Sequence, residues 1–222
     1  MSHNPFDVVR QFESALCKYT GAPYCVTTTS CTSALMLAVA WHLRQQRWLA
    51  MEADMLVHFL GSLPVKIPKR TYVGVAHAIL NAGGRPTYRE EEWRGEYQLK
   101  PLPVVDSARW LRSGMYRAGQ MMCLSFHHTK HLGLAAHGGA ILHDNAEADA
   151  WLRRARFDGR TEGVAPKDDK FQAPAWHCYM TPATAAEGLM RLAVLPKHND
   201  PLPWGPGTNS DYPDLSLQEA FK

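Results

Sequence analysis

Short apolar runs alternate with longer segments of helical periodicity along this chain, and that alternation limits the folds open to it. Strands that alternate with helices build a sheet covered by helices on both faces, with mostly parallel neighbours. The expected fold class is therefore α/β, with a mostly parallel sheet. The expected strands are residues 24–28, 65–67, 103–105, 121–126 and 139–142, and the expected helices are residues 6–18, 33–47, 73–82, 145–156 and 181–195.

The composition of the chain is that of an ordinary globular protein. Its 222 residues are 45% hydrophobic and 20% charged, which is enough for one sizeable core. The formal net charge of +3 is too small to indicate a nucleic-acid partner by itself. No window is apolar over the length of a bilayer span, and the first residues lack the regions of a signal peptide. The five scattered cysteines lack a C-x-x-C pair, so we expect no disulfide framework and a reducing cytoplasmic compartment.

The periodic pattern ends near Leu195. From there to Lys222 the chain is polar and interrupted by prolines, which is typical of a tether or a surface arm. We therefore expect a domain over residues 1–195 and a proline-rich arm over residues 196–222. The segment from Arg44 to Leu63 is apolar-rich and predicts an extended or inserted helix.

Two residues carry the chemistry that the sequence indicates. Lys130 follows an apolar run and a short polar turn, and the pair Gly138-Gly139 comes shortly after it. Burial lowers the pKa of a lysine and makes it a nucleophile for Schiff-base formation. Asp106 ends another apolar run. A lysine and a strand-end aspartate are the two groups that pyridoxal 5′-phosphate (PLP) requires, which makes Lys130 and Asp106 the candidate catalytic residues.

The eleven histidines suggest a metal site, but their spacing does not support one. The cluster His127-His128-x-x-His131 has no matching ligands nearby in the sequence, so we expect no metal.

Several motifs occur in the order in which one enzyme family has them. They are Phe12-Glu13, Tyr19-Thr20-Gly21-Ala22, Ser30-Cys31-Thr32-Ser33-Ala34-Leu35, Ile67-Pro68-Lys69-Arg70-Thr71-Tyr72, Gly83-Gly84-Arg85-Pro86, Asp106-Ser107-Ala108, Ser125-Phe126 with Lys130, Arg156-Phe157-Asp158-Gly159-Arg160 and Met180-Thr181-Pro182-Ala183-Thr184-Ala185-Ala186. Together they resemble the DegT/StrS family of PLP-dependent aminotransferases, which mostly act on nucleotide-linked keto sugars. The resemblance implies the large domain of the PLP-dependent transferase fold type I, with a seven-stranded-type sheet, truncated because the usual small C-terminal domain is missing.

The resemblance also implies a set of site residues. Lys130 would form the internal aldimine and carry protons, Asp106 would pair with the pyridine nitrogen, and Tyr72 would stack on the cofactor ring. The cofactor phosphate would be held by Cys31, Thr32, Ser33 and Ser125.

Three positions depart from the family pattern. Cys31 replaces a glycine, so a positive φ is expected to strain its backbone. Arg109 stands in place of a glutamine near the cofactor's ring oxygen, where a cation would favour the phenolate and could change the reaction. His177 lies in the segment that usually reaches the cofactor of a neighbouring subunit.

Three functions remain open from the sequence. The first is an aminotransferase that moves an amino group from an amino acid to a keto sugar or a similar carbonyl, in a homodimer with a shared active site. The second is a PLP-dependent decarboxylase or lyase acting on an amino-acid-like group of a larger nucleotide or nucleic-acid substrate, which the basic cluster of Arg153, Arg154, Arg156 and Arg160 would contact. The third is a degenerate structural subunit.

Overall fold

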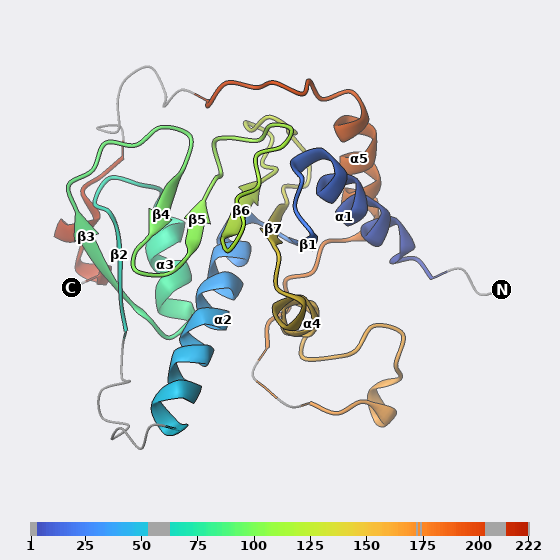
Figure 1. Ribbon diagram of the computed structural model, residues 1–222, viewed down its shortest axis with the longest axis horizontal. Coiled ribbons are helices and arrows are strands. Elements are labelled where there is room, and N and C mark those ends of the chain that lie inside the picture. The colour runs from blue at the N-terminus through green and yellow to red at the C-terminus, as the bar shows by residue number, and fades with distance from the viewer. Residues whose placement is uncertain (1–3, 53–62, 172, 174, 203–211, 222) are drawn as a thin grey trace.

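The computed structural model describes residues 4–52, 63–171, 173, 175–202 and 212–221, with the side chains of residues 46–52 left out. The strands are β1 (Tyr24–Thr28), β2 (Pro64–Pro68), β3 (Arg85–Arg89), β4 (Tyr97–Leu99), β5 (Val104–Asp106), β6 (Met121–Ser125) and β7 (Gly139–His143). The α-helices are α1 (Asp7–Thr20), α2 (Cys31–Glu52), α3 (Val73–Asn81), α4 (Ala146–Ala155) and α5 (Pro182–Ala193). In place of the expected seven-stranded-type sheet, a five-stranded sheet in the order β1-β7-β6-β5-β4 forms the centre, and β2 and β3 form a two-stranded sheet (Figure 1). A single bridge between Lys66 and Lys100 links the two sheets.

The central sheet is mixed, which corrects the expectation of a mostly parallel sheet. Only β5 and β6 are parallel within it, while β1 with β7, β7 with β6, and β5 with β4 are antiparallel. The type of connection explains two of these antiparallel pairs. A loop without a helix joins β6 to β7, and a short turn joins β4 to β5, so each second strand returns antiparallel beside the first. The α/β class itself is confirmed.

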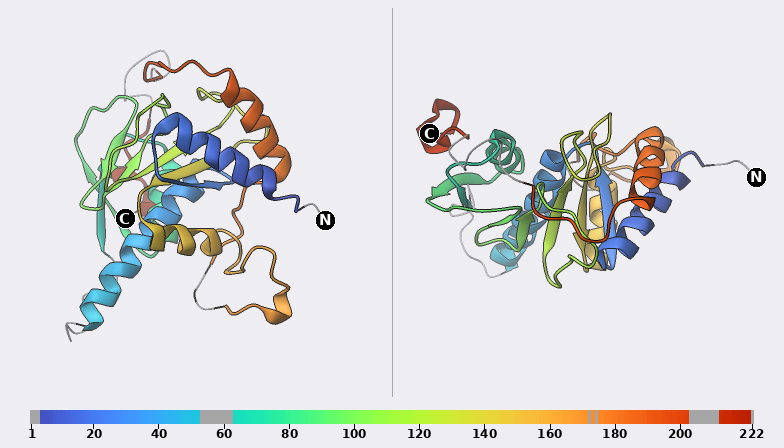
Figure 2. Two further views of the ribbon diagram at one scale, coloured as in Figure 1. Left: turned by 45° about the vertical axis from the view of Figure 1, so that its right-hand side comes forward. Right: turned by 90° about the horizontal axis from the view of Figure 1, so that it is seen from above.

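Helices cover both faces of the central sheet, as expected from the sequence (Figure 2). Alternate side chains along each strand enter different cores. Along β6, Met121 and Cys123 pack on the side of α2, α3 and α4, whereas Met122 and Leu124 pack on the side of α1 and α5. A strand that is apolar on both faces must lie inside a three-layered domain, which is why these runs show no polar alternation.

The helix ends follow from local sequence. Gly21, at φ 81°, ends α1 in the left-handed conformation that glycine adopts readily. Asn145 caps α4 by accepting a hydrogen bond from the amide of Ala148 at 2.9 Å, and Thr181 caps α5 in the same way before Pro182. The predicted boundaries of these helices therefore agree with the observed ones to within a few residues.

The long helix α2 extends to Glu52, beyond the predicted end at residue 47. The rest of the apolar-rich segment predicted from the sequence, residues 53–62, lies outside the described residues. Within the part of the chain that the structure describes, no helix combines the length and the apolar character needed to cross a bilayer.

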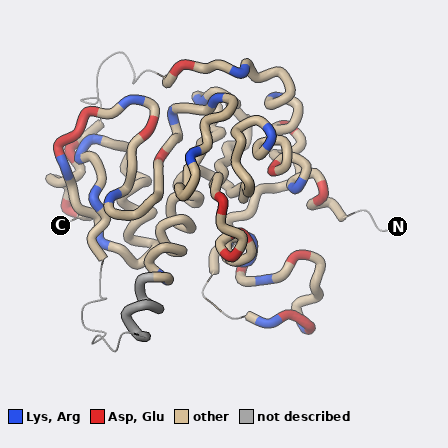
Figure 3. The backbone as a smooth tube through the Cα atoms, viewed as in Figure 1, with Lys and Arg blue, Asp and Glu red and all other residues tan. Residues whose placement is uncertain are grey.

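A buried ion cluster joins α1, β1 and the end of α4. Glu13, which is 3% exposed, accepts hydrogen bonds from Nη1 of Arg156 at 2.5 Å and from Nη1 of Arg153 at 2.6 Å. Its Oε1 also accepts from the amide and the hydroxyl of Thr27, each at 2.9 Å. Two arginines of the predicted basic cluster are therefore engaged with Glu13, Arg156 inside the protein and Arg153 in a half-buried position. Outside this cluster, Figure 3 shows basic and acidic residues mixed along the described chain.

Residues 212–221 lie beside β2 and β3 (Figure 1). Leu215 is fully buried there, and its amide donates to the carbonyl of Lys69 at 2.9 Å. Asp214 forms an ion pair with Lys69 at 3.2 Å. These contacts bring residues near the C-terminus to the edge of the cavity described next.

Candidate active site

A cavity of about 500 Å³ lies where β5 and β6 end and α2 begins. The two strands are parallel neighbours, so Asp106 and Ser125 end at the same edge of the sheet. Pockets of this size suit a small organic ligand. The residues that line the cavity are Thr29, Ser30, Cys31, Thr32, Leu35, Thr71, Tyr72, Val75, Trp93, Asp106, Ala108, Arg109, Ser125, His127, Thr129, Lys130, His137, Gly138 and Tyr212.

Lys130 lies in this cavity, on the loop that joins β6 to β7. Its amide donates to the carbonyl of His127 at 2.8 Å, which closes the polar turn that the sequence indicated. Burial lowers the pKa of the ammonium group, and the positive charge of Arg109 lowers it further, while Asp106 partly opposes both. The amine is thus available as a nucleophile more often than that of an exposed lysine.

Asp106 is 4% exposed and held in a fixed orientation. Its Oδ1 accepts from the amide of Ala108 at 2.9 Å, and its Oδ2 accepts from the hydroxyl of Tyr97 at 3.0 Å. The hydroxyl of Tyr97 has one proton, which it donates to Asp106. In the 2.7 Å hydrogen bond between Thr71 and Tyr97, the hydroxyl of Thr71 must therefore be the donor. Burial raises the pKa of Asp106, and its hydrogen bonds and the cations Lys130 and Arg109 only partly oppose this. A cationic ring nitrogen in the cavity would stabilise the carboxylate.

Hydroxyl groups gather at the start of α2. Thr29, Ser30, Thr32 and Ser125 line the cavity there. The first N–H groups of a helix lack intrahelical partners and carry a partial positive charge, which suits a phosphate. Ser33 does not line the cavity. Its Oγ contacts the hydroxyls of Ser30 at 3.0 Å and Thr29 at 3.1 Å, so it orients groups that do.

Gly139 allows β7 to pass directly against this turn. A Cβ at this position would lie 2.4 Å from the carbonyl carbon of Ser30 and 2.5 Å from the amide nitrogen of Cys31. Real side chains do not approach backbone atoms so closely. The Gly138-Gly139 pair therefore fixes the position of the first turn of α2.

Cys31 corrects one expectation from the sequence. It begins α2, and Asp158 and His137 are the non-glycine residues with positive φ among those described. The replacement of glycine by cysteine therefore introduces no backbone strain here, because the position is helical. The Sγ of Cys31 points to the carbonyl of Cys123 at 3.7 Å, and burial raises the thiol pKa well above its usual range.

Two further predicted residues line the cavity, and one lies outside it. Tyr72 is 58% exposed at the edge of the cavity, and Arg109 lies deeper, near Lys130. His177 does not line the cavity; its Nδ1 lies 2.7 Å from Oδ2 of Asp158. Its predicted contact with the cofactor of a neighbouring subunit stays a prediction.

Sequence reasoning missed Trp93, Tyr212 and the histidines at the edge of the cavity, His127 and His137. Tyr212 is held by Arg70, whose Nη1 donates to its carbonyl at 3.0 Å, and its hydroxyl interacts with Arg109. The local sequence of Tyr212 gave no signal, since it stands in a polar, proline-rich segment far from the other site residues in the chain.

The residues present fit PLP. A partly desolvated amine and a buried carboxylate face one cavity, beside a helix start rich in hydroxyls. These are the partners for the aldehyde, the ring nitrogen and the phosphate of that cofactor. The fold and the cavity thus define an α/β domain with a lysine in a cavity whose lining suits this cofactor.

Comparison with known proteins confirms the resemblance found in the sequence. Residues 3–101 match the model of the DegT/DnrJ/EryC1/StrS aminotransferase family. A search of curated proteins gave no match.

Solved structures of this type share the fold. A DegT/DnrJ/EryC1/StrS aminotransferase from Brucella abortus matches with a TM-score of 0.65 and 18% identity, over 85% of this chain and 59% of that one. A sugar aminotransferase from Micromonospora echinospora matches with a TM-score of 0.64 and 17% identity, over 85% and 61%. NtdA from Bacillus subtilis, with bound cofactor PMP, matches with a TM-score of 0.61 and 20% identity, over 85% and 48%. The chain therefore spans about three fifths of the length of the first of these.

Proposed function

We propose that this protein is a PLP-dependent aminotransferase that moves an amino group from an amino acid to a keto sugar or a similar carbonyl compound. The observation that carries the proposal is the meeting of Lys130 and Asp106 in one cavity at the start of α2. The two residues come from different parts of the chain, and each has the environment that its role requires. The family match and the sugar aminotransferase among the structural neighbours support the substrate class.

Lys130 and Asp106 have distinct tasks in this proposal. PLP, when bound, supplies an aldehyde and an electron-withdrawing ring that stabilises a carbanion. The Nζ of Lys130 binds the cofactor and afterwards moves a proton as general acid and base. The carboxylate of Asp106 accepts a hydrogen bond from the ring nitrogen and keeps a proton on that atom. Tyr97 and Ala108 hold the carboxylate in place for this task.

The remaining residues bind and orient. Thr32 and Ser125, with the amides of the first turn of α2, hold the phosphate, and Ser33 fixes the orientation of Ser30. The backbone amide of Cys31 belongs to the same group. Tyr72 lies at the edge of the cavity, where its ring can stack on a flat ligand.

A second candidate function, that of a PLP-dependent decarboxylase or lyase, is favoured by Arg109. This cation lies close enough to Lys130 to lower its pKa. A fixed positive charge in the cavity changes the electronics of the cofactor and can divert the reaction from transamination. A nucleic-acid substrate receives less support, because Arg153 and Arg156 are engaged with Glu13.

We further propose a homodimer in which the segment of His177 completes the site of the neighbouring subunit. Residues 1–195 would form the cofactor domain and residues 196–222 an arm that wraps over it. Cytoplasmic location is supported by the five free cysteines, four of them buried, because such thiols persist in a reducing compartment.

The visible absorbance of the protein mixed with PLP tests this function. We expect a band that requires Lys130, is lost in Lys130→Ala, and is bleached when glutamate is added. Lys167→Ala removes an exposed lysine outside the cavity and serves as the control, with a band like that of the unchanged protein. A band that persists with glutamate but responds to another amine would favour the decarboxylase or lyase. Absence of a band in the unchanged protein would contradict both functions and leave a structural subunit.

A further inference from the structure

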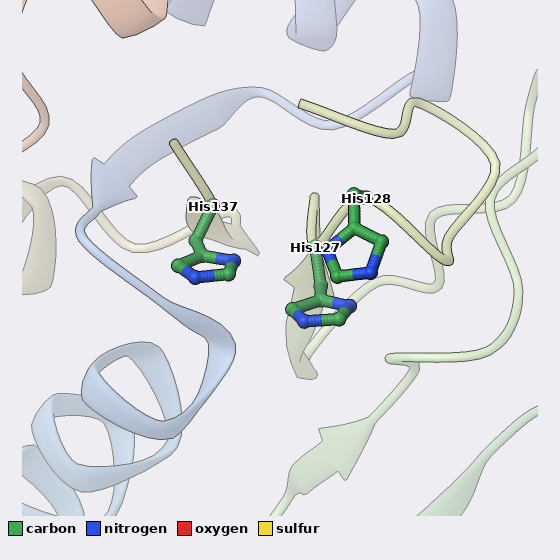
Figure 4. Close-up of side chains that lie close together, drawn as sticks. All are labelled: His127, His128 and His137. Carbon is green, nitrogen blue, oxygen red and sulfur yellow. The ribbon is translucent and has the colours of Figure 1, made fainter. Parts of the chain in front are cut away.

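Three histidines converge at the mouth of the cavity. His127 and His128 follow β6, and His137 comes from the far end of the same loop, just before β7. One ring nitrogen of each lies within 4.8 Å of those of the other two, and the rings gather together in Figure 4. The ring centroid of His127 lies 4.0 Å from that of His128 and 4.8 Å from that of His137.

Backbone hydrogen bonds fix this arrangement. The amide of Phe126 donates to the carbonyl of Gly138 at 2.8 Å, which holds the two ends of the loop together. The amide of Leu134 donates to the carbonyl of Phe126, also at 2.8 Å, and anchors the middle of the loop. The strand pairing and the hydrogen bonds of the loop therefore fix the Cα positions of the three histidines.

The backbone of His137 is itself unusual. Its φ of 64° lies in the left-handed region, which non-glycine residues seldom occupy and which is common at functional sites. The imidazole of His137 lies beside the other two rings, and its plane is within 2° of that of His127 (Figure 4).

We propose that His127, His128 and His137 form a binding site for a divalent transition metal of the zinc class, with one coordination position open to the cavity. Imidazole nitrogen suits zinc, nickel and copper, while a site without carboxylates is unsuited to magnesium or calcium. Zinc–nitrogen bonds of about 2.1 Å at the tetrahedral angle put ligand atoms about 3.4 Å apart. The ring nitrogens must therefore approach by up to about 1.4 Å, which side-chain rotations at an exposed site allow.

Thr129 supports the site as a positioning residue. Its Oγ1 lies 2.9 Å from Nδ1 of His127. Nδ1 also accepts a hydrogen bond from the amide of Thr129 at 3.3 Å, so it is an acceptor in the absence of a metal. When a metal binds Nε2, the ring proton moves to Nδ1, which then donates it to the hydroxyl of Thr129. Such outer partners fix the orientation of a ligating histidine and raise its affinity for the ion.

The position of the site indicates what a bound metal ion would do. His127 and His137 both line the cavity, so an ion held by the three imidazoles faces the space that Lys130 also faces. Three protein ligands and one open position are typical of zinc sites that accept an exchangeable ligand. The bound ion would hold an anionic group, a carboxylate or a phosphate, of a molecule entering the cavity. This inference does not depend on PLP chemistry.

Calorimetric titration of the full chain with Zn²⁺, in the absence of PLP, tests the site. We expect one ion per chain, and at least a 100-fold loss of affinity in His128→Ala and in His137→Asn. Asparagine is chosen because it tolerates positive φ, so the loop keeps its shape without the ligand. Thr129→Val should weaken binding about 10- to 100-fold.

His131→Ala is the matched control. His131 lies on the same loop but binds the carbonyl of Asp200 through Nε2 at 2.9 Å, away from the cluster. Its loss should change the affinity less than twofold. Equal losses in His131→Ala and His137→Asn would show a histidine-rich loop without a defined site and would overturn the proposal, as would unchanged binding in His137→Asn.

Cobalt substitution tests the open position. The visible spectrum of bound Co²⁺ should change when acetate or inorganic phosphate is added, because the anion enters the coordination sphere. A spectrum that ignores both anions would contradict the open position, even if three histidines bind the ion.

Discussion

Gly139 shows at the scale of one residue how the first turn of α2, the proposed phosphate site, depends on close backbone packing. A methyl group there would meet the peptide that joins Ser30 to Cys31, and backbone cannot move aside as a side chain can. We expect Gly139→Ala to destabilise the protein by about 1–3 kcal/mol, the usual cost of overpacking, and also to weaken PLP binding. Urea unfolding and a PLP titration measure the two effects.

Gly163→Ala provides the comparison. Gly163 has a φ of 81°, but a Cβ there meets no atom within 4 Å. The substitution should cost about 1–2 kcal/mol from its backbone conformation alone and leave PLP affinity unchanged. If the two variants weakened PLP binding equally, the role of Gly139 at the turn would be refuted.

Residues that line the cavity were predictable where a strand end and a local motif coincide. Lys130, Asp106 and Tyr72 have such signals, and all three line one cavity. Tyr212 has no such signal, because it reaches the cavity through the docked C-terminal segment, far along the chain. His137 lies two residues before β7, but the sequence does not indicate its left-handed backbone conformation.

At the scale of elements, the C-terminal segment is held beside the cavity by one buried side chain. Leu215 is fully buried, whereas Leu217, in the same short 3-10 helix, is 69% exposed. We expect Leu215→Ala to cost about 2–5 kcal/mol of the free energy that docks this segment. Faster hydrogen exchange of the Leu215 amide, which donates to Lys69, would report the release.

Leu217→Ala should leave that exchange rate close to that of the unchanged protein. Its side chain removes little apolar surface from water on folding. Equal acceleration in both variants would mean that burial of Leu215 is not what holds the segment.

Whether a segment forms a helix or a strand was more predictable than the direction in which a strand runs in the sheet. The helices are recognisable from periodicity and from caps such as Asn145 and Thr181. The strand direction depends on the connection between strands, and the loop after β6 gave no sign that it lacks a helix. β3 and β4 were missed. The residues of β3, Arg85–Arg89, are mostly polar, include Pro86, and apart from Pro86 are exposed or half-buried. β4 has only three residues, Tyr97–Leu99.

At the scale of the whole molecule, the buried cluster around Glu13 links stability to pH. Burial raises the pKa of this carboxyl, but Arg156 and Arg153 outweigh burial and leave the pKa below its ordinary value of 4.5. A lowered folded-state pKa contributes stability that is present above about pH 4.5 and is lost as the pH falls through the folded-state value. We expect Glu13→Gln to cost about 3–5 kcal/mol at pH 7, because Arg156 stays buried without its partner.

Urea unfolding at pH 7 and at pH 4 measures this linkage, with a smaller difference between the two pH values in Glu13→Gln. Glu162→Gln is the control, since Glu162 pairs with Arg10 at the surface and such pairs contribute about 1 kcal/mol or less. Similar losses in the two variants would contradict a special role for the buried cluster.

The pairing of β1 with β7 has a consequence for how the chain acquires its structure. Thr28 pairs with Gly139 and Tyr24 with His143, so partners stand about half the chain apart. Pairing of distant residues requires closure of a long loop, and proteins built on such contacts fold slowly. During synthesis the apolar side chains of β1 cannot pack beside β7 until β7 has left the ribosome. The first half of the chain therefore spends that interval with exposed apolar surface, which makes the nascent protein a natural client for chaperones.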